Sequence, residues 1–236
     1  MNVYEIGSIA EKLQNNTYPG RGIILGITPD GVNKVAAYFI MGRSLNSRNR
    51  IFKPEDDGIS TEAFDPSKLE DPSLIIYHPV REIEDDLVVT NGDQTDTIVN
   101  SIKLGGSFEA GLRTREFEPD GPNWTPRISG IQFKDGSYKL SILKSVDAEG
   151  SGCTRQFFEY PPVAGLGHFI HTYVTNGDPI PTFVGEPERV DILNDIDEYT
   201  ALLWNSLDPD NKISLYVRYT QLDDGSFEDI VVNANQ

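Results

Sequence analysis

The sequence predicts an α+β protein whose strands are mostly antiparallel and divided between two sheets. Short apolar runs of strand type follow one another along the chain and end at Gly, Pro, Asn or Asp. Helical periodicity is confined to a few segments, which do not alternate with the strands as βαβ units require. About ten strands rarely form one sheet beside so few helices, so two sheets are expected. The length of 236 residues fits one domain, residues 1–236.

The strand predictions rest on apolar runs that flank recognisable turns. Residues 21–27 (RGIILGI) and 34–41 (KVAAYFIM) lie on either side of Pro-Asp-Gly and predict a hairpin. Residues 132–146 predict a second hairpin with Asp-Gly at its turn. Other apolar runs predict a strand pair at 74–80 and 87–90, and single strands at 155–160, 168–174, 213–220 and 227–233.

The helix predictions rest on apolar spacing and on capping residues. Apolar side chains recur every three or four positions over residues 189–207, which predicts the longest helix. Thr95-Asp96 can cap a helix that runs to Leu104, where two glycines end it. Residues 109–115 are expected to continue helically, and the first fifteen residues to hold a short helix.

The chain is acidic, and this limits the classes of partner. With 37 acidic and 20 basic residues its formal net charge is −17, which disfavours non-specific binding to nucleic acid or to an anionic membrane. No apolar run approaches the ~18 residues that span a bilayer, and the N-terminus does not resemble a signal peptide. We therefore expect a cytoplasmic protein. The single cysteine, Cys153, excludes an internal disulfide framework and a cysteine-built zinc site.

Residues 1–50 depart from this acidic balance. They hold six basic and three acidic side chains, whereas the remaining 186 residues carry a net charge of −20. Arg43, Arg48 and Arg50 follow the strand at 34–41, with Ser44 among them. Guanidinium groups suit phosphate and carboxylate oxygens, so a small anion is the expected ligand. The alternative is a surface loop that pairs with some of the chain's many acids.

Arg21 stands between two glycines at the start of the first strand. Gly22 carries no side chain and would let a ligand approach the backbone closely. The alternative is a surface turn with a solvated arginine.

Two other segments place polar groups at the ends of elements. Asn91, Gly92 and Asp93 form a tight turn directly before the helix at 95–104, whose free N–H groups could bind an anion or polarise a carbonyl. Plain helix capping is the alternative. Arg127 enters a strand after an acidic stretch that includes Glu118, and a structural Arg–Glu pair is the alternative there.

His168 and His171 lie three residues apart in a predicted strand and should face opposite sides of the sheet. No third metal ligand is close in sequence, so a zinc site is disfavoured. A hydrogen-bonding or acid–base role is more plausible for one of them.

The order of these segments resembles the IMP cyclohydrolase family of the archaeal type and its bacterial relatives. The matching stretches are YPGRG, AYFIMGRSLNSRNRIF, TNGDQTD, TPRISGI, GLGHFIHTY and PIPTFVGEP. The resemblance implies a four-layer αββα sandwich of two mostly antiparallel sheets, similar to N-terminal nucleophile hydrolases. It also implies closure of 5-formamidoimidazole-4-carboxamide ribotide, a purine ribotide, to IMP with loss of water. No metal and no organic cofactor are expected.

The resemblance also implies roles, which we state as hypotheses. The phosphate and carbonyl oxygens of the substrate would be shared among Arg21, Arg43, Arg48 and Arg50. Tyr77 is the candidate proton donor, and Arg127 with Glu118 would orient or polarise the carboxamide. The remaining substrate-binding candidates are Gly22, Ser44, Asn91, Gly92, Asp93, His168 and His171.

Two other classes of function stay open at this level. A purine-nucleotide-binding protein would keep the phosphate site without the chemistry. An amide hydrolase of the same fold needs a Cys, Ser or Thr exposed by processing, whereas Asn2 follows Met1 here. The oligomeric state is also open, with a homo-oligomer among the alternatives.

Overall fold

The computed structural model describes residues 2–69 and 76–235. Its helices are α1 (Ile9–Gln14), α2 (Leu45–Arg48), the 3-10 turn η1 (Pro66–Lys68), α3 (Gln94–Lys103), α4 (Phe108–Arg113) and α5 (Ile196–Ser206). Its strands are β1 (Arg21–Ile27), β2 (Asn33–Met41), β3 (Arg50–Glu55), β4 (Gly58–Ala63), β5 (Val80–Ile83), β6 (Asp86–Thr90), β7 (Arg127–Gln132), β8 (Tyr138–Ser145), β9 (Cys153–Tyr160), β10 (Leu166–His171), β11 (Glu188–Asp191), β12 (Lys212–Gln221) and β13 (Phe227–Asn233). Within the described residues, no helix is both long and apolar enough to cross a membrane.

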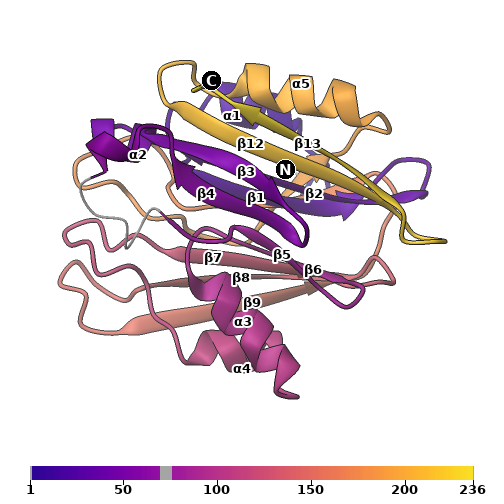
Figure 1. Ribbon diagram of the computed structural model, residues 1–236, viewed down its shortest axis with the longest axis horizontal. Helices are drawn as coiled ribbons and strands as arrows, with labels where there is room; N and C mark the ends of the chain where they lie inside the picture. Colours follow the sequence, from indigo (N-terminus) through magenta and orange to yellow (C-terminus); the bar gives the residue numbers. More distant parts are fainter. Residues whose placement is uncertain (1, 70–75, 236) are drawn as a thin grey trace.

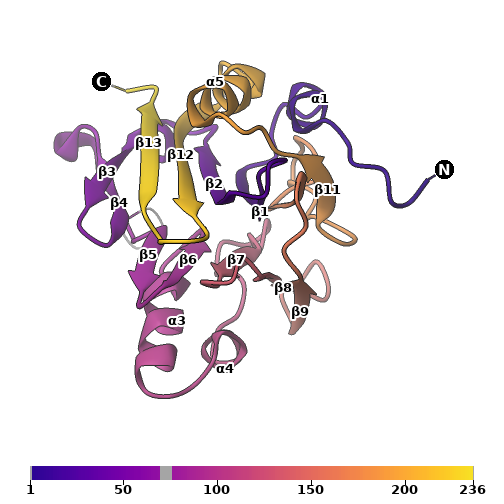
Figure 2. The same ribbon diagram turned by 90° about the vertical axis from the view of Figure 1, so that its right-hand side faces the viewer.

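Two antiparallel sheets stack face to face and are covered by helices on their outer faces. In the described chain the six-stranded sheet has the order β11-β10-β1-β2-β12-β13, and the seven-stranded sheet runs from β3 to β9 in sequence order. Helices α1 and α5 lie over the first sheet, and α3 and α4 lie under the second (Figures 1 and 2). This arrangement confirms the α+β class, the two antiparallel sheets and the four layers.

Each layer boundary has its own hydrophobic core. On β1, Ile23 and Leu25 face the other sheet, while Ile24 packs under the helices. Side chains of a strand alternate between its two faces, so a strand buried on both faces reads as an unbroken apolar run. A third core, which includes Ile98 and Leu112, joins α3 and α4 to the seven-stranded sheet.

The hairpins that the sequence predicts are present. β1 pairs with β2 from Arg21 opposite Ile40 to Ile27 opposite Lys34. β7 and β8 form the second hairpin, and the turn between them contains Gly136 with a φ of +83°. The strands expected at 155–160, 213–220 and 227–233 correspond to β9, β12 and β13.

The long helix predicted over residues 189–207 is wrong in its first part. Residues 188–191 form β11 at the edge of the six-stranded sheet, where Val190 pairs with Gly167. The helix α5 begins only after Asp195, whose carboxylate accepts a hydrogen bond from the Glu198 N–H. The spacing is misleading because β11 and α5 bury side chains in the same core.

The strand predicted at 74–80 differs from the structure as well. Residues 74–75 lie outside the described residues, residues 76–79 belong to no strand, and β5 begins at Val80. The backbone N–H of Tyr77 donates to the hydroxyl of Thr61 on β4 instead. Strands β3 and β4 have no apolar run that would predict them; Pro54 fits in β3 because this strand lies at the edge of its sheet.

Two element boundaries also shift. The helix expected to be capped by Thr95-Asp96 begins one residue earlier, at Gln94, after Asp93. The strand expected at 168–174 is β10, which ends at His171.

Candidate active site

Four chain segments bring charged and phenolic side chains together. Arg21 opens β1, Arg50 opens β3, Tyr77 lies just before β5, and Glu118 lies on the connection that leads to β7. The guanidinium of Arg21 and the carboxylate of Glu118 are 3.9 Å apart. All four side chains are buried or nearly so, and water therefore screens their charges weakly.

Arg50 is the least compensated charge in this cluster. Its side chain is 0% exposed, and its Nε donates to the carbonyl of Ser47 at 2.7 Å. Its Nη1 has no hydrogen-bond partner, and no carboxylate of the described chain pairs with it. Burial and the nearby Arg21 lower the pKa of Arg50. A buried cation with an unpaired N–H donor is costly, so this position calls for an anionic or carbonyl ligand.

Arg21 and Glu118 form the ionic centre of the cluster. Burial alone would lower the pKa of Arg21. The Glu118 carboxylate and nearby phenol groups raise it by more, so the pKa of Arg21 is raised. Burial raises the pKa of Glu118 above its ordinary value, against the opposing effect of Arg21, Arg127 and Arg50. A carboxylate with a raised pKa between cations is suited to exchanging a proton with a ligand.

Two tyrosines meet beside these charges. The hydroxyls of Tyr77 and Tyr38 share a hydrogen bond of 2.8 Å. Tyr38 lies on β2 in the core between the sheets, and Phe52 of β3 stacks on its ring. The hydroxyl of Thr61 accepts a hydrogen bond from the Tyr77 N–H and donates one to the Tyr77 carbonyl.

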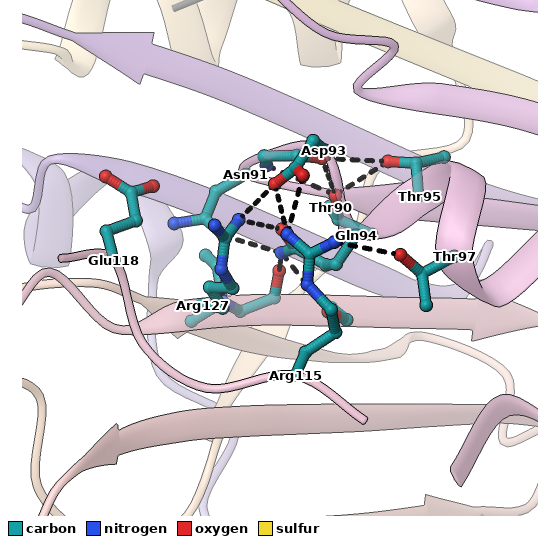
Figure 3. A network of polar contacts seen from close by, with 12 residues as sticks. Thr90, Asn91, Asp93, Gln94, Thr95, Thr97, Arg115, Glu118 and Arg127 are labelled. Carbon is teal, nitrogen blue, oxygen red and sulfur yellow. Dashed lines mark hydrogen bonds and ion pairs between the residues drawn. The ribbon is translucent and has the colours of Figure 1, made fainter. Parts of the chain in front are cut away.

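Arg127 is held in a second polar network at the start of α3 (Figure 3). Its Nη1 lies 2.7 Å from the carboxylate of Asp93 and donates to the side-chain carbonyl of Gln94 at 2.7 Å. Arg115 binds both carboxylate oxygens of Asp93 at 2.6 Å. The buried Nε of Arg127 has no partner in the described chain, so this guanidinium retains a free donor.

Asn91 and Gly92 shape this network from within the turn. The Asn91 amide donates to the carbonyl of Pro126 and accepts from the Ile128 N–H. A Cβ added at Gly92 would lie 2.6 Å from Nη1 of Arg127, so the glycine allows the guanidinium to approach.

The other predicted arginines lie closer to the surface. Arg43 donates to the side chain of Asn176 and to the carbonyl of Gly177, and it lies over the ring of Tyr18. Arg48 donates to the carbonyl of Gly42. Ser44 caps α2. Arg43, Ser44 and Arg48 are exposed, unlike the side chains of the buried cluster.

The two histidines lie on opposite faces of β10, as the spacing predicts. His168 shares a hydrogen bond of 2.7 Å with the hydroxyl of Tyr138. Burial lowers the pKa of His168 to about 4, so it is neutral near pH 7. His171 faces Glu188 on β11, with 3.1 Å between Nε2 and the carboxylate.

Gly22 leaves room for the ring of Phe39.

Sequence reasoning did not identify Tyr38 and Arg115. Tyr38 is hidden in an unbroken apolar run, where a phenol is not distinguished from any other core residue. Arg115 is one of two arginines in the sequence RTR, and no pattern there separates it from Arg113.

The buried arginines, the carboxylate of Glu118 and the phenol pair lie within an αββα sandwich, and their chemistry suits a small ligand rich in anionic and carbonyl oxygens. A family model described as IMP cyclohydrolase-like protein matches residues 18–225. The chain belongs to this family. All four residues of the buried cluster lie within the matched region.

Curated proteins named IMP cyclohydrolase are similar to about half of the chain. One from Methanococcus maripaludis is 37% identical over 128 residues, which is 51% of this chain and 61% of the relative. One from Methanosphaera stadtmanae is 34% identical over 131 residues, 53% of this chain and 63% of the relative. The matched segments therefore span less than two thirds of these relatives.

Proposed function

We propose that this protein closes 5-formamidoimidazole-4-carboxamide ribotide to IMP and water. The observation that carries the proposal is the fully buried Arg50, whose Nη1 has no partner in the described chain. The substrate offers a phosphate with about −1.5 to −2 charges at neutral pH, together with two carbonyl oxygens. Membership in the IMP cyclohydrolase-like family supports this substrate class.

The reaction joins two arms of one molecule. The carboxamide nitrogen attacks the formyl carbon, a C–N bond forms, and the formyl oxygen takes up a proton while the nitrogen loses one. In the second step the C–O bond breaks, water leaves, and a ring nitrogen loses its proton as the C=N bond forms. Holding both arms in one plane supplies much of the rate, because attacker and target are already in contact.

The buried cluster contains a group for each demand of this chemistry. Arg50 and Arg21 would stabilise charge on the ligand's oxygens, as preorganised donors do. Glu118 would accept the proton of the carboxamide nitrogen, and Tyr77 would give its proton to the formyl oxygen. The free Nε of Arg127 would hold the carboxamide oxygen.

Replacing Arg50 tests the proposal directly. We expect Arg50→Met to lower kcat/KM for the formamido ribotide by about 10²-fold or more, since a charged donor to the ligand is lost. Arg113→Met, an exposed arginine on α4, is the matched control and should keep wild-type activity. Absorbance at the wavelength of IMP formation measures both.

Two results would contradict this assignment. Wild-type protein that binds IMP tightly without forming it would indicate a nucleotide-binding protein. An Arg50→Met variant with wild-type kcat/KM would remove Arg50 from the site.

A further inference from the structure

The phenol of Tyr38 has a single hydrogen-bonding neighbour. Among the described residues its hydroxyl contacts only the hydroxyl of Tyr77, at 2.8 Å. Tyr38 is 0% exposed, whereas Tyr77 retains an exposed fraction of 6%. The two phenols therefore form a short chain that runs from the core between the sheets to the site.

The position of the protons in this chain follows from burial. Burial raises the pKa of Tyr38 well above its ordinary value, and the neighbouring Tyr77 raises it further. Tyr38 consequently stays protonated at any working pH. Its buried O–H would be left unsatisfied unless it donates to Tyr77, which is its one available acceptor among the described residues.

Donation by Tyr38 leaves the proton of Tyr77 free for a ligand. Arg21 and Arg50 lie close to both phenols. Both guanidinium groups are donors only, so they stabilise a negative oxygen and cannot accept its proton.

We propose that Tyr38 is a positioning residue for proton transfer: it donates a permanent hydrogen bond to the Tyr77 oxygen, directs the Tyr77 proton toward the substrate and stabilises the phenolate that remains. The inference rests on the proposed cyclohydrolase function. In the cycle, Tyr77 gives its proton to the formyl oxygen. Glu118 then passes the proton it took from the carboxamide nitrogen to the same oxygen as the C–O bond breaks and water leaves, and the Tyr77 phenolate takes back a proton from the ring nitrogen. Tyr38 keeps its own proton throughout.

The test compares Tyr38→Phe with Tyr216→Phe. Tyr216 lies directly opposite Tyr38 on β12, is equally buried in the same core and also loses one hydroxyl hydrogen bond, to Asp229. We expect Tyr38→Phe to lower kcat by at least tenfold with KM within twofold of wild type, and Tyr216→Phe to leave both unchanged. The alkaline limb of the kcat profile should move to higher pH in Tyr38→Phe, because an anionic Tyr77 oxygen has lost its donor.

A double-mutant cycle separates this role from a structural one. In a Tyr77→Phe background the change Tyr38→Phe should cost nothing further in kcat, since Tyr38 acts only through Tyr77. Equal losses in both backgrounds, or equal kcat for Tyr38→Phe and Tyr216→Phe in an active enzyme, would overturn the proposal. Wild-type protein without turnover would instead overturn the proposed function and this inference with it.

Discussion

At the scale of single residues, Asp93 shows how one carboxylate can organise a site. It precedes α3 in the capping position, yet its side chain makes no capping hydrogen bond. Its oxygens bind Arg115 and Arg127 instead. Burial alone would raise the pKa of Asp93, but the two arginines outweigh it, and the pKa is lowered. The carboxylate is therefore ionised at neutral pH and holds the Nη1 end of the Arg127 guanidinium in place.

Removing this charge should affect activity more than stability. Asp93→Asn keeps the size of the side chain and weakens two charge-assisted hydrogen bonds, so we expect kcat/KM to fall by about tenfold. The loss of stability should be about 1 kcal/mol, because the Asp93 side chain is 49% exposed. Turnover of the formamido ribotide and urea unfolding measure the two effects.

Asp96→Asn provides the matched control for this change. Asp96 lies in the first turn of the same helix and pairs with Arg81 and His78, neither of which belongs to the buried cluster. It should lose a similar amount of stability and keep its activity. Equal activity losses in the two variants would mean that Asp93 acts only by holding α3 in place.

The sequence alone predicts which residue types to expect in a site, but it does not show how deeply each is buried. Arg43, Arg48 and Arg50 look equivalent in the sequence, since all three follow one strand. Only Arg50 starts a new strand, β3, and this carries it into the interior. No apolar run in the sequence predicts β3, and its pairing partner β4 is equally polar in sequence.

At the scale of elements, the edge strand β11 is where sequence and structure differ most. Its apolar residues share a core with α5, so a local pattern could not separate the two elements. What fixes β11 in place is its non-local contact with β10 and α1. Glu188 interacts with His171 of β10 and with Lys12 of α1.

This contact should make stability dependent on pH. The hydrogen bond with His171 lowers the pKa of Glu188 to about 2 against the effect of burial, and Lys12 lowers it further. Because the folded-state pKa lies below the ordinary value of 4.5, the stabilisation is full above pH 4.5 and is lost as the pH falls toward 2. We expect Glu188→Gln to lose about 1 kcal/mol at pH 7 and almost none near pH 2.

Urea unfolding at pH 7, 5 and 3 measures this difference. Glu228→Gln on β13 is the control, because that exposed carboxylate has no ion pair within the described chain. A Glu188→Gln deficit that stays constant from pH 7 to pH 3 would show that packing, and not charge, is lost.

At the scale of the whole molecule, the side chain of Asn233 joins the two sheets between β13 and β3. Asn233 at the end of β13 accepts a hydrogen bond from the Phe52 N–H of β3 at 2.8 Å and donates to the Phe52 carbonyl at 3.0 Å. It also accepts from the hydroxyl of Ser214. These groups lie up to 181 residues apart in sequence, so no local pattern could predict the junction. The amide of Asn235 extends it to the carbonyl of Arg48.

The junction connects the C-terminal strand to the site, because Phe52 is two residues from Arg50 on the same strand. We expect Asn233→Ala to lower the free energy of unfolding by about 2 kcal/mol, since it leaves both backbone groups of Phe52 without a partner. The start of β3 should then be held less firmly, so KM for the formamido ribotide should rise several-fold while kcat changes less. Urea unfolding, steady-state kinetics and hydrogen exchange of the Phe52 amide measure these effects.

Asn205→Ala, at an exposed position on α5, is the control. It should not lower the stability, raise KM or speed exchange of the Phe52 amide. If Asn233→Ala loses the stability but keeps a wild-type KM, the position of Arg50 is set by β3 and β4 alone, and the C-terminal strand serves the fold without serving the site.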